Sequence, residues 1–311
     1  MQTVMIAGAA GFVGRHAAAE AARHGAALTL MSHRRIPPRP GGRTAVRHVR
    51  GDLMAPDSLR GVCDGVDVLL HCASQIGGAP EANDLVNARG TAALVAEARR
   101  AGVSRIVYLS TASVYGRGVF RGARPEEIER RPASPTSRSR AAAEDIVGAA
   151  GGFVLRPYLV YGPGDQWVVP GLLRLLRALD GAAADWDARL SVISVTELAA
   201  LLVAVGLAPR ERLSAPAYHA AYPAPVRASE LLRAVADGTG AGPAWPRVSL
   251  AGARARLRED RAAPGALDML ATDHWFGSET VWADTGRQVP GPAQDLDFPR
   301  MREWYADRVA A

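Results

Sequence analysis

The residues most suggestive of chemistry are three glycines spaced three apart near residue 10. They belong to the run Gly8-Ala-Ala-Gly11-Phe-Val-Gly14, which lies between a short apolar run and an amphipathic stretch. One glycine permits a tight turn, another lets the backbone approach a pyrophosphate, and a third allows close packing of a helix on a strand. The helix that begins there offers free N–H groups to phosphate oxygens. The spacing therefore predicts a dinucleotide site rather than a glycine-rich turn without a ligand.

The residues after the second apolar run, 28–31, bear on the choice of nicotinamide cofactor. A site for NAD carries an acid there, which holds the ribose 2′-hydroxyl group. This chain has Ser32, His33, Arg34 and Arg35, none of which is a carboxylate. Because arginine can bind a 2′-phosphate bidentately, the sequence favours NADPH/NADP. The alternative is that one of these arginines is simply solvated.

Two further segments follow strands that should reach the same cofactor. Asp52-Leu53 stands where an acid after the third strand would bind the adenine amine. His71-Cys-Ala-Ser ends the fourth strand, so Ala73 and Ser74 are expected beside the cofactor. His71 alone would more often be structural than catalytic.

Short strands alternate with helices through the first 160 residues. Strands are expected over 4–7, 28–31, 46–49, 66–70, 105–109 and 153–156, and helices over 12–24, 83–101 and 136–149. This alternation predicts βαβ units and a parallel sheet covered on both faces. After about residue 165, helices dominate, over 170–179, 195–207, 228–238 and 298–309. The segment 117–135 is rich in charge, Gly and Pro, and we expect a long surface loop there that could serve as a lid.

Composition and charge narrow the class of protein. The 311 residues have a mean hydropathy of −0.02, which is typical of a soluble globular chain. The net charge of +6 is the difference between 37 basic residues, all of them arginine, and 31 acidic ones. No nucleic-acid motif accompanies the arginines. We therefore expect no nucleic-acid partner. The absence of lysine also excludes a Schiff-base amine from the chain.

The sequence carries no sign of export. The first residues include no basic segment or cleavage site, and no apolar run reaches the roughly 18–20 residues that span a membrane. We therefore expect no membrane partner. Cys63 and Cys72 are expected to be plain buried thiols, which suits a cytoplasmic protein. No metal site is expected.

Taken together, these motifs resemble the extended short-chain dehydrogenase/reductase family. The matching pieces are GAAGFVG (8–14), GDL (51–53), HCAS (71–74), NARGT (87–91), YLSTASVYG (108–116) and LRPYLVYGPGD (155–165). The resemblance covers nearly the whole chain. It implies an α/β fold, with a Rossmann-like doubly wound parallel sheet of about seven strands and a smaller C-terminal substrate domain.

The resemblance also implies a division of the chain and a class of reaction. The NADP-binding domain would cover 1–165 and receive a later strand near 189–195, and 166–311 would be mainly the substrate-binding region with lid elements. The chemistry would be hydride transfer to or from a small molecule, with sugar nucleotides and tailored natural products as the usual substrates. Assembly into a homodimer is left open.

For the cofactor, the resemblance assigns roles to particular residues. The backbone amides of Phe12 and Val13 would join the three glycines around the phosphates. Pro157 and Tyr158 would contact the nicotinamide carboxamide. Arg140 would place a cation near the ribose.

For the substrate, the resemblance places Thr111 at a hydroxyl position that helps bind the reacting oxygen, with Ser113 close by. These two are therefore the expected catalytic residues. Further substrate contacts are expected from Ser74, Gln75, Ser113, Tyr115 and Trp167.

The chain departs from the family at its proton donor, a tyrosine followed four residues later by lysine. Thr136 and Arg140 stand at these two positions, and none of the seven tyrosines is followed by a basic residue four positions later. An aliphatic hydroxyl is a far weaker acid than a phenol. Positioned acid catalysis is worth roughly 10²–10⁴-fold in rate. We therefore expect poor chemistry on an ordinary, unassisted ketone.

Two interpretations stay open. In the first, the protein is an NADPH-dependent ketoreductase of an aromatic polyketide, similar to atypical ketoreductases that tailor angucyclinone antibiotics. A phenolic hydroxyl group beside the ketone would then stabilise the developing oxyanion, with help from Thr111 or Ser113 and a water. In the second, the protein senses NADP(H) without catalysis. A sugar-nucleotide 4-ketoreductase is a further alternative, whereas sugar-nucleotide epimerases and dehydratases would need the missing phenolate base.

Overall fold

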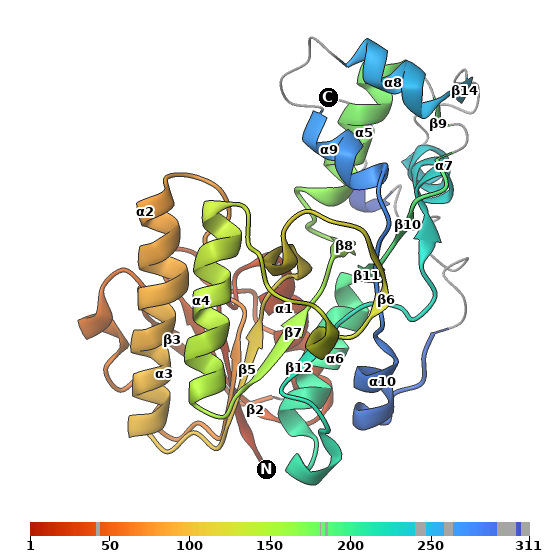
Figure 1. Ribbon diagram of the computed structural model, residues 1–311. Helices are drawn as coiled ribbons and strands as arrows, with labels where there is room; N and C mark the ends of the chain where they lie inside the picture. Colours follow the sequence, from red (N-terminus) through yellow and green to blue (C-terminus); the bar gives the residue numbers. More distant parts are fainter. Residues whose placement is uncertain are drawn as a thin grey trace.

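The large sheet has seven strands, all parallel, in the order β12-β7-β5-β4-β1-β2-β3 (Figure 1). This computed structural model describes residues 1–41, 44–180, 182–183, 186–239, 247–257, 264–290 and 303–305. The strands are β1 (Thr3–Ala7), β2 (Ala27–Ser32), β3 (Val46–Arg50), β4 (Val68–His71), β5 (Arg105–Leu109), β7 (Phe153–Arg156) and β12 (Ala217–His219). The strand order reverses beside β1, which is the doubly wound arrangement expected from the sequence.

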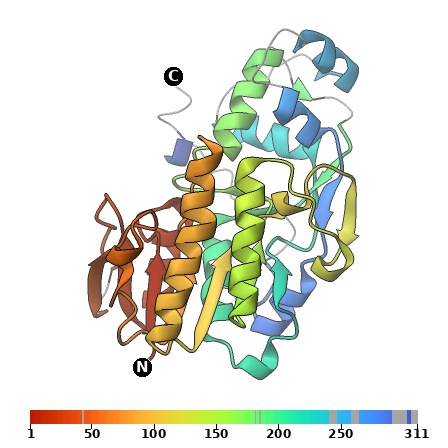
Figure 2. The same ribbon diagram turned by 60° about the vertical axis from the view of Figure 1, so that its left-hand side comes forward.

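Helices cover both faces of this sheet. On one face lie α1 (Phe12–Arg23) and α6 (Val195–Leu207), which pack on each other, with α10 (Glu279–Thr285) against α6. On the other face, α2 (Pro80–Asn83), the π-helical turn η2 (Asp84–Arg89) and α3 (Gly90–Arg100) follow one another beside α4 (Pro135–Ala149). Figure 2 shows α3 and α4 side by side in front of the strands.

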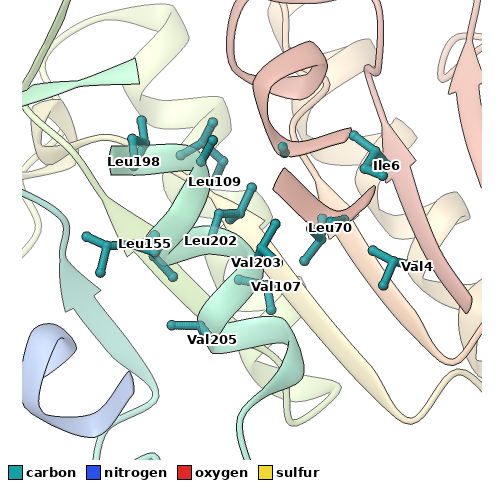
Figure 3. Close-up of a cluster of buried hydrophobic side chains, with 14 of the residues drawn as sticks. Val4, Ile6, Leu70, Val107, Leu109, Leu155, Leu198, Leu202, Val203 and Val205 are labelled. Carbon is teal, nitrogen blue, oxygen red and sulfur yellow. The ribbon is translucent and has the colours of Figure 1, made fainter. Parts of the chain in front are cut away.

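Strand side chains alternate between these two faces. Val4 and Ile6 of β1 belong to the same hydrophobic cluster as Leu202 of α6, whereas Met5 belongs to a second cluster beneath α3 and α4 (Figure 3). Buried parallel strands need apolar residues at every position for this reason. Helix α6 is apolar nearly all round because it packs on the sheet and on helices at once.

The later part of the chain builds smaller sheets and a helical group beyond the carboxyl ends of the strands (Figure 1). The helices are α5 (Val168–Leu179), α7 (Ala228–Thr239), α8 (Leu250–Arg256) and α9 (Pro264–Leu270). One four-stranded sheet has the order β13 (Val226–Arg227), β10 (Arg189–Leu190), β15 (His274–Phe276) and β6 (Phe120–Ala123). Two pairs are formed by β8 (Leu159–Tyr161) with β11 (Val192–Ser194), and by β9 (Ala182–Ala183) with β14 (Arg247–Val248).

One expectation about the sheet is wrong. The later strand that joins the large sheet is β12, at 217–219, and not a strand near 189–195. Pro157 separates β7 from β8, and β8 turns out of the large sheet and pairs with β11 instead. Both α6 and β12 follow residue 165 in the chain, yet they pack with the first half. The division into two domains at residue 165 therefore stays a prediction.

Two other expectations need comment. The segment 117–135 is not only a loop, because it contains β6 and the short helix η4 (Pro125–Glu127). The helix expected over 298–309 lies outside the described residues except for 303–305, which are helical. Within the part of the chain that the structure describes, no helix has the length and apolar character needed to cross a membrane.

Candidate active site

The turn after β1 is shaped by two close backbone approaches. Gly8 has φ of +81°, and a Cβ there would lie 2.8 Å from the backbone N and Cα of Ala73. A Cβ on Gly14 would overlap the Gly8 carbonyl oxygen and lie 2.8 Å from its carbon. Gly11 closes the turn by donating its N–H to Gly8 O at 2.8 Å. Only glycine fits at positions 8 and 14, so the turn brings the start of α1 against the end of β4.

The first turn of α1 is left open toward the carboxyl ends of the strands. Its N-cap is Gly11, and no side chain accepts a hydrogen bond from the N–H groups there. The amides of Phe12 and Val13 are among the donors that the helix itself cannot satisfy. Donors of this kind, with the partial positive charge of the helix end, bind phosphate oxygens. The residues present therefore fit the pyrophosphate of a dinucleotide.

The end of β2 gathers the residues expected at the nucleotide ribose. Arg34 and Arg35 are exposed, and neither makes an ion pair with another described residue. His33 Nε2 lies 3.0 Å from Asp52 Oδ2, so these two side chains share one contact. Ser32 is half-buried at the end of the strand. The arrangement leaves two cations available to a phosphate at this edge.

Leu53, next to Asp52, is held by packing against Gly90. It is 7% exposed, and its backbone oxygen and Cβ lie where a side chain on Gly90 would have to go. Close packing on the first residue of α3 therefore fixes the segment that carries Asp52.

The segment after β4 is held by Asn87 of the π-helical turn. The N–H of Gln75 donates to Asn87 Oδ1 at 2.7 Å, and Asn87 Nδ2 donates to Gln75 O at 2.9 Å. Asn87 also donates to Ser139 Oγ at 3.0 Å, which links the segment to α4. Single-turn π-helices are often found at functional sites. Here the turn fixes Ser74 and Gln75 at the end of the strand.

Arg140 is a buried cation that points into the protein. Its guanidinium donates to Leu109 O and, at 3.2 Å, to Ser74 Oγ, and it lies 5.7 Å from the centre of the Tyr108 ring. Among the described residues, no carboxylate pairs with it. Burial, and secondarily the Arg140 charge, lower the pKa of His71 to about 3, so that imidazole is neutral. The guanidinium charge of Arg140 is therefore not neutralised by a described carboxylate. It would favour a ligand with negatively charged or electron-rich atoms.

Thr136, at the position of the family's tyrosine, has its hydroxyl group engaged on both sides. It donates to Asn83 Oδ1 at 2.8 Å and accepts the N–H of Gly77 at 3.2 Å. Asn83 is fully buried and uses its amide NH₂ on the carbonyls of Gly77 and Ala79. Thr136 thus ties α4 to the segment 77–83. Its proton is committed to a protein acceptor.

Thr111 and Ser113 form a short hydroxyl chain after β5. Thr111 Oγ1 accepts the N–H of Ser113 and donates to Ser113 Oγ, both at 3.2 Å. Between them, Ala112 donates its N–H to Pro157 O at 2.8 Å, which sets this turn beside the end of β7. Ser113 is exposed, and its own proton has no acceptor among the described side chains. The Ser113 hydroxyl group, at the end of this chain, can therefore donate a hydrogen bond to a ligand oxygen beside it.

Tyr115 lies beneath this turn in a buried polar network. Its hydroxyl group contacts His219 Nε2 at 2.6 Å and accepts from Arg156 Nη1 at 2.7 Å. Arg156 in turn makes two bonds to Glu144, at 2.6 and 3.0 Å, and Arg130 reaches the same carboxylate at 3.1 Å. Tyr115 is 2% exposed, so its assignment as a substrate contact stays a prediction, and both sides of its hydroxyl group already have protein partners.

The network has a defined state of protonation. Burial lowers the pKa of His219 to about 3, and burial raises the pKa of Tyr115 to about 12. Both groups are therefore neutral near pH 7 while Arg156 and Glu144 carry the charges. A bidentate ion pair of this kind is stable only with its hydrogen bonds complete.

Tyr158 follows Pro157 and joins a cluster of aromatic rings. It stacks on His274 with ring centres 5.3 Å apart and a tilt of 12°, and it meets Phe276 edge to face at 6.0 Å. Burial raises the pKa of its phenol well above the usual value. Phe120 completes the cluster, 5.4 Å from both His274 and Phe276.

Trp167 lies on a separate turn at the start of α5. It is 60% exposed, and Asp165 holds the helix start by accepting the N–H groups of Trp167, Val168 and Val169. Tyr305 Oη accepts the N–H of Gly162 at 2.9 Å and lies 3.0 Å from Asp165 Oδ2.

This turn also touches the phosphate-binding helix. The carbonyl oxygen of Pro163 accepts from Arg15 and lies 3.0 Å from His16 Nε2. The structure therefore places Trp167 on the same side as the glycine turn, and no hydrogen bond among the described residues joins it to Thr111 or Ser113.

The carboxyl ends of β1, β4, β5 and β7 thus bring together most of the expected residues. Sequence reasoning missed Asn83, Asn87, His219 and the Arg156–Glu144 pair, all of which hold that edge in place. Asn87 begins the NARGT motif (87–91), and its place in that motif could have indicated a role at the site. His274 also lies at this edge, where its ring stacks on Tyr158.

A family model described as the NAD dependent epimerase/dehydratase family matches residues 4–213. A 2-alkyl-3-oxoalkanoate reductase of Stenotrophomonas maltophilia is 29% identical over 290 residues, which is 83% of this chain and 86% of that protein. The decarboxylating sterol-4-alpha-carboxylate 3-dehydrogenase of Saccharomyces cerevisiae is 31% identical over 144 residues, 42% of this chain and 41% of that enzyme. The match thus spans less than half of the yeast protein.

Among solved structures, an epimerase from the methanogen Methanothermobacter thermautotrophicus superimposes with a TM-score of 0.77. It covers 98% of this chain and 92% of that one, at 18% sequence identity. At this identity the likeness establishes the fold, and it agrees with the seven-stranded parallel sheet described above.

Proposed function

The chain belongs to the NAD dependent epimerase/dehydratase family, and from that premise we propose that it is an NADPH-dependent ketoreductase. Its substrate is an aromatic polyketide, similar to an angucyclinone, whose ketone is flanked by a phenolic hydroxyl group. A reduced nicotinamide dinucleotide supplies the hydride. The protein supplies binding, orientation and hydrogen bonds, and it uses no tyrosine acid.

The preference for NADPH is supported by the charges at the end of β2. Arg34 and Arg35 are exposed, and neither is paired with a described carboxylate. Asp52, which follows β3 beside the end of that strand, lies 3.0 Å from His33. A 2′-phosphate would gain charge-assisted bonds from the two guanidinium groups.

The observation that carries the proposed mechanism is the hydrogen bonding of Thr136. Its proton is bound to Asn83 Oδ1, and an aliphatic hydroxyl group is in any case too weak an acid to replace a phenol near neutral pH. Arg140, four residues on, turns inward to Leu109 and Ser74. Neither side chain can protonate the substrate oxygen, so its negative charge must be stabilised by the substrate together with hydrogen bonds from other residues.

Thr111 and Ser113 have the hydrogen-bonding roles that remain. Ser113 donates to the ketone oxygen, and Thr111 supports it by donating to Ser113 Oγ. The phenolic hydroxyl group next to the ketone makes an internal hydrogen bond to the same oxygen. As the oxygen becomes negative both bonds strengthen, which lowers the barrier. The proton then comes from the substrate or from a water.

The relatives support reduction of a ketone but leave other substrates in view. The Stenotrophomonas relative is named for reduction of a 3-oxoalkanoate, and its match covers most of both chains. The structural neighbours include epimerases, whose fold this chain shares. Epimerases and dehydratases oxidise an unactivated alcohol and need a phenolate base, so we favour reduction. A sugar-nucleotide 4-ketoreductase and an NADP(H) sensor are the alternatives.

Turnover on a panel of ketones separates these alternatives. The protein is mixed with NADPH and with aromatic polyketide ketones that carry, or lack, a hydroxyl group beside the carbonyl, and NADPH absorbance is followed. We expect turnover only with the hydroxylated members. Tight NADPH binding without turnover of any ketone would favour the sensor, and turnover of nucleotide-linked 4-keto sugars alone would favour the sugar-nucleotide enzyme.

Replacing both Arg34 and Arg35 by alanine tests the cofactor. Loss of two bonds to a phosphate, at roughly 1.5–3 kcal/mol for each charged bond, should weaken NADPH binding at least tenfold more than NADH binding. Fluorescence titration of both cofactors measures the two dissociation constants. Arg99→Ala and Arg100→Ala, at the far end of α3, serve as charge-matched controls. Equal weakening of NADPH and NADH would refute the assignment to NADPH.

A further inference from the structure

His274 is a polar member of the aromatic cluster at the site. Its ring is half-buried between Tyr158, at 5.3 Å, and Phe120, at 5.4 Å. The β15 strand fixes this position, since His274 pairs with Phe120 of β6 on one side and with Leu190 of β10 on the other. The pairing fixes the backbone of His274, and the ring is held by its packing between Tyr158 and Phe120 and by the contact of Nδ1 with the carbonyl oxygen of Thr272.

The hydrogen bonds of His274 define which nitrogen is free. Nδ1 lies 3.1 Å from the carbonyl oxygen of Thr272, which can only accept a hydrogen bond. Nδ1 must therefore carry the proton, and in the neutral ring Nε2 carries the lone pair. Among the residues that the structure describes, Nε2 has no hydrogen-bond partner.

Burial keeps the His274 ring neutral. Burial lowers the pKa of His274 below its usual value, although the Thr272 carbonyl and Asp273 act in the opposite direction. Asp273 is occupied by Arg121 Nε at 2.6 Å and by the N–H of Arg189 at 2.7 Å. Tyr158 and Phe120 bring no charge to the ring. His274 is consequently a hydrogen-bond acceptor and not a cation.

The position of the ring relates it to the reacting groups. Tyr158 follows Pro157, and the carbonyl of Pro157 binds the turn that carries Thr111 and Ser113. Tyr158 is thus in contact with His274 on one side and, through its neighbour, with the hydroxyl chain on the other. The hydrophobic cluster that contains Tyr158 and Phe120 also includes Ala112 and Val114 of that turn, so the rings pack against the segment that carries the hydroxyl chain.

We propose that His274 sets the specificity of the substrate site, with Nε2 accepting a hydrogen bond from a second phenolic hydroxyl group of the aromatic ketone, distinct from the one beside its carbonyl. This inference rests on the proposed ketoreductase function and narrows its substrate to polyhydroxylated aromatics. A ligand without that hydroxyl group leaves Nε2 desolvated and without a partner, which weakens its binding.

Binding of two anthraquinones tests the proposal without any turnover. Chrysophanol and emodin are aromatic polyketide quinones that differ by one phenolic hydroxyl group, and both carry hydroxyl groups beside a carbonyl. Their dissociation constants are measured by calorimetry on the NADP⁺-loaded full chain and on His274→Phe, which keeps an aromatic ring. We expect emodin to bind about tenfold more tightly than chrysophanol to the natural protein, and equally to His274→Phe.

His274→Gln is the matched variant, because its side-chain oxygen is an acceptor near the place of Nε2. It should restore part of the preference for emodin, while thermal unfolding and NADPH affinity show that the variants are folded. An equal affinity for both quinones in the natural protein, or a preference that survives in His274→Phe, would overturn the proposal. If the preference depends on His274 but no aromatic ketone is reduced, the ketoreductase function fails and the binding role stands.

Discussion

Replacing Thr136 by valine should destabilise the protein without slowing its reaction. Valine keeps the shape of the side chain but removes the hydroxyl group that donates to Asn83 Oδ1 at 2.8 Å and accepts from Gly77 at 3.2 Å. Asn83 is fully buried, so its oxygen loses its donor in a place that water does not reach. An unsatisfied buried acceptor costs about 1–3 kcal/mol. For a chain of this size the melting temperature should fall by roughly 2–10 °C.

The rate should respond differently, because the proton of Thr136 is already bound to a protein acceptor. We expect kcat and KM for a phenol-flanked ketone to change by no more than about twofold, since the transition state loses no contact. Thermal unfolding gives the first quantity, and steady-state kinetics well below the melting temperature give the second. Thr136→Ser is the control, because it keeps the hydroxyl group and should recover most of the stability.

The opposite result would refute this reasoning. A fall in kcat of about 100-fold in Thr136→Val, with NADPH affinity intact, is the size expected when a positioned acid is removed. Thr136 would then be the proton donor, and the substrate would not be acting alone. An unchanged melting temperature would contradict the structural half of the argument.

Gly14→Ala should abolish dinucleotide binding measured by fluorescence titration, because its Cβ would overlap the Gly8 carbonyl oxygen, whereas Gly148→Ala in α4 meets nothing within 4 Å and should leave binding unchanged. Gly14→Ala that binds normally would contradict the role of the turn. The stability of the protein should also fall as the pH drops from 7 to 5. Burial lowers the pKa of both His71 and His219 to about 3, so between about pH 6.5 and 3 the unfolded chain binds more protons than the folded one. The free energy of unfolding, measured in urea, should fall by about 4 kcal/mol between pH 7 and 5 because of these two groups, whose stabilising contribution is complete only above about pH 6.5. A His71→Gln variant with the same pH dependence as the natural protein would show that this histidine is not the cause.

The first half of the fold follows from local patterns in the sequence. The strand expected over 4–7 is observed as Thr3–Ala7, and the helix expected over 136–149 as Pro135–Ala149. Apolar runs of this length, bounded by glycine or by a Ser-Pro start, are determined by residues close to one another in the chain. The glycine turn could be located for the same reason, since its spacing and its neighbours lie within a dozen residues.

What the sequence could not predict depends on contacts between distant segments. The bond from Thr136 to Asn83 joins residues 53 apart, and the contact between Tyr115 and His219 joins residues 104 apart. The pairing of β6 with β15 likewise joins residues near 120 to residues near 275, and neither strand is long enough to give a pattern of its own. The preference for NADPH and the individual site residues stay predictions, which the experiments above address.

The contact of Tyr305 with the Gly162–Asp165 turn has a practical consequence for anyone who shortens this chain. Removing the segment that contains Tyr305 takes away the hydroxyl group that lies on Gly162 N and Asp165. The same turn presents Pro163 O to Arg15 and His16 on the phosphate-binding helix. A truncated version would therefore lose affinity for the dinucleotide even though every residue of the glycine turn had been retained.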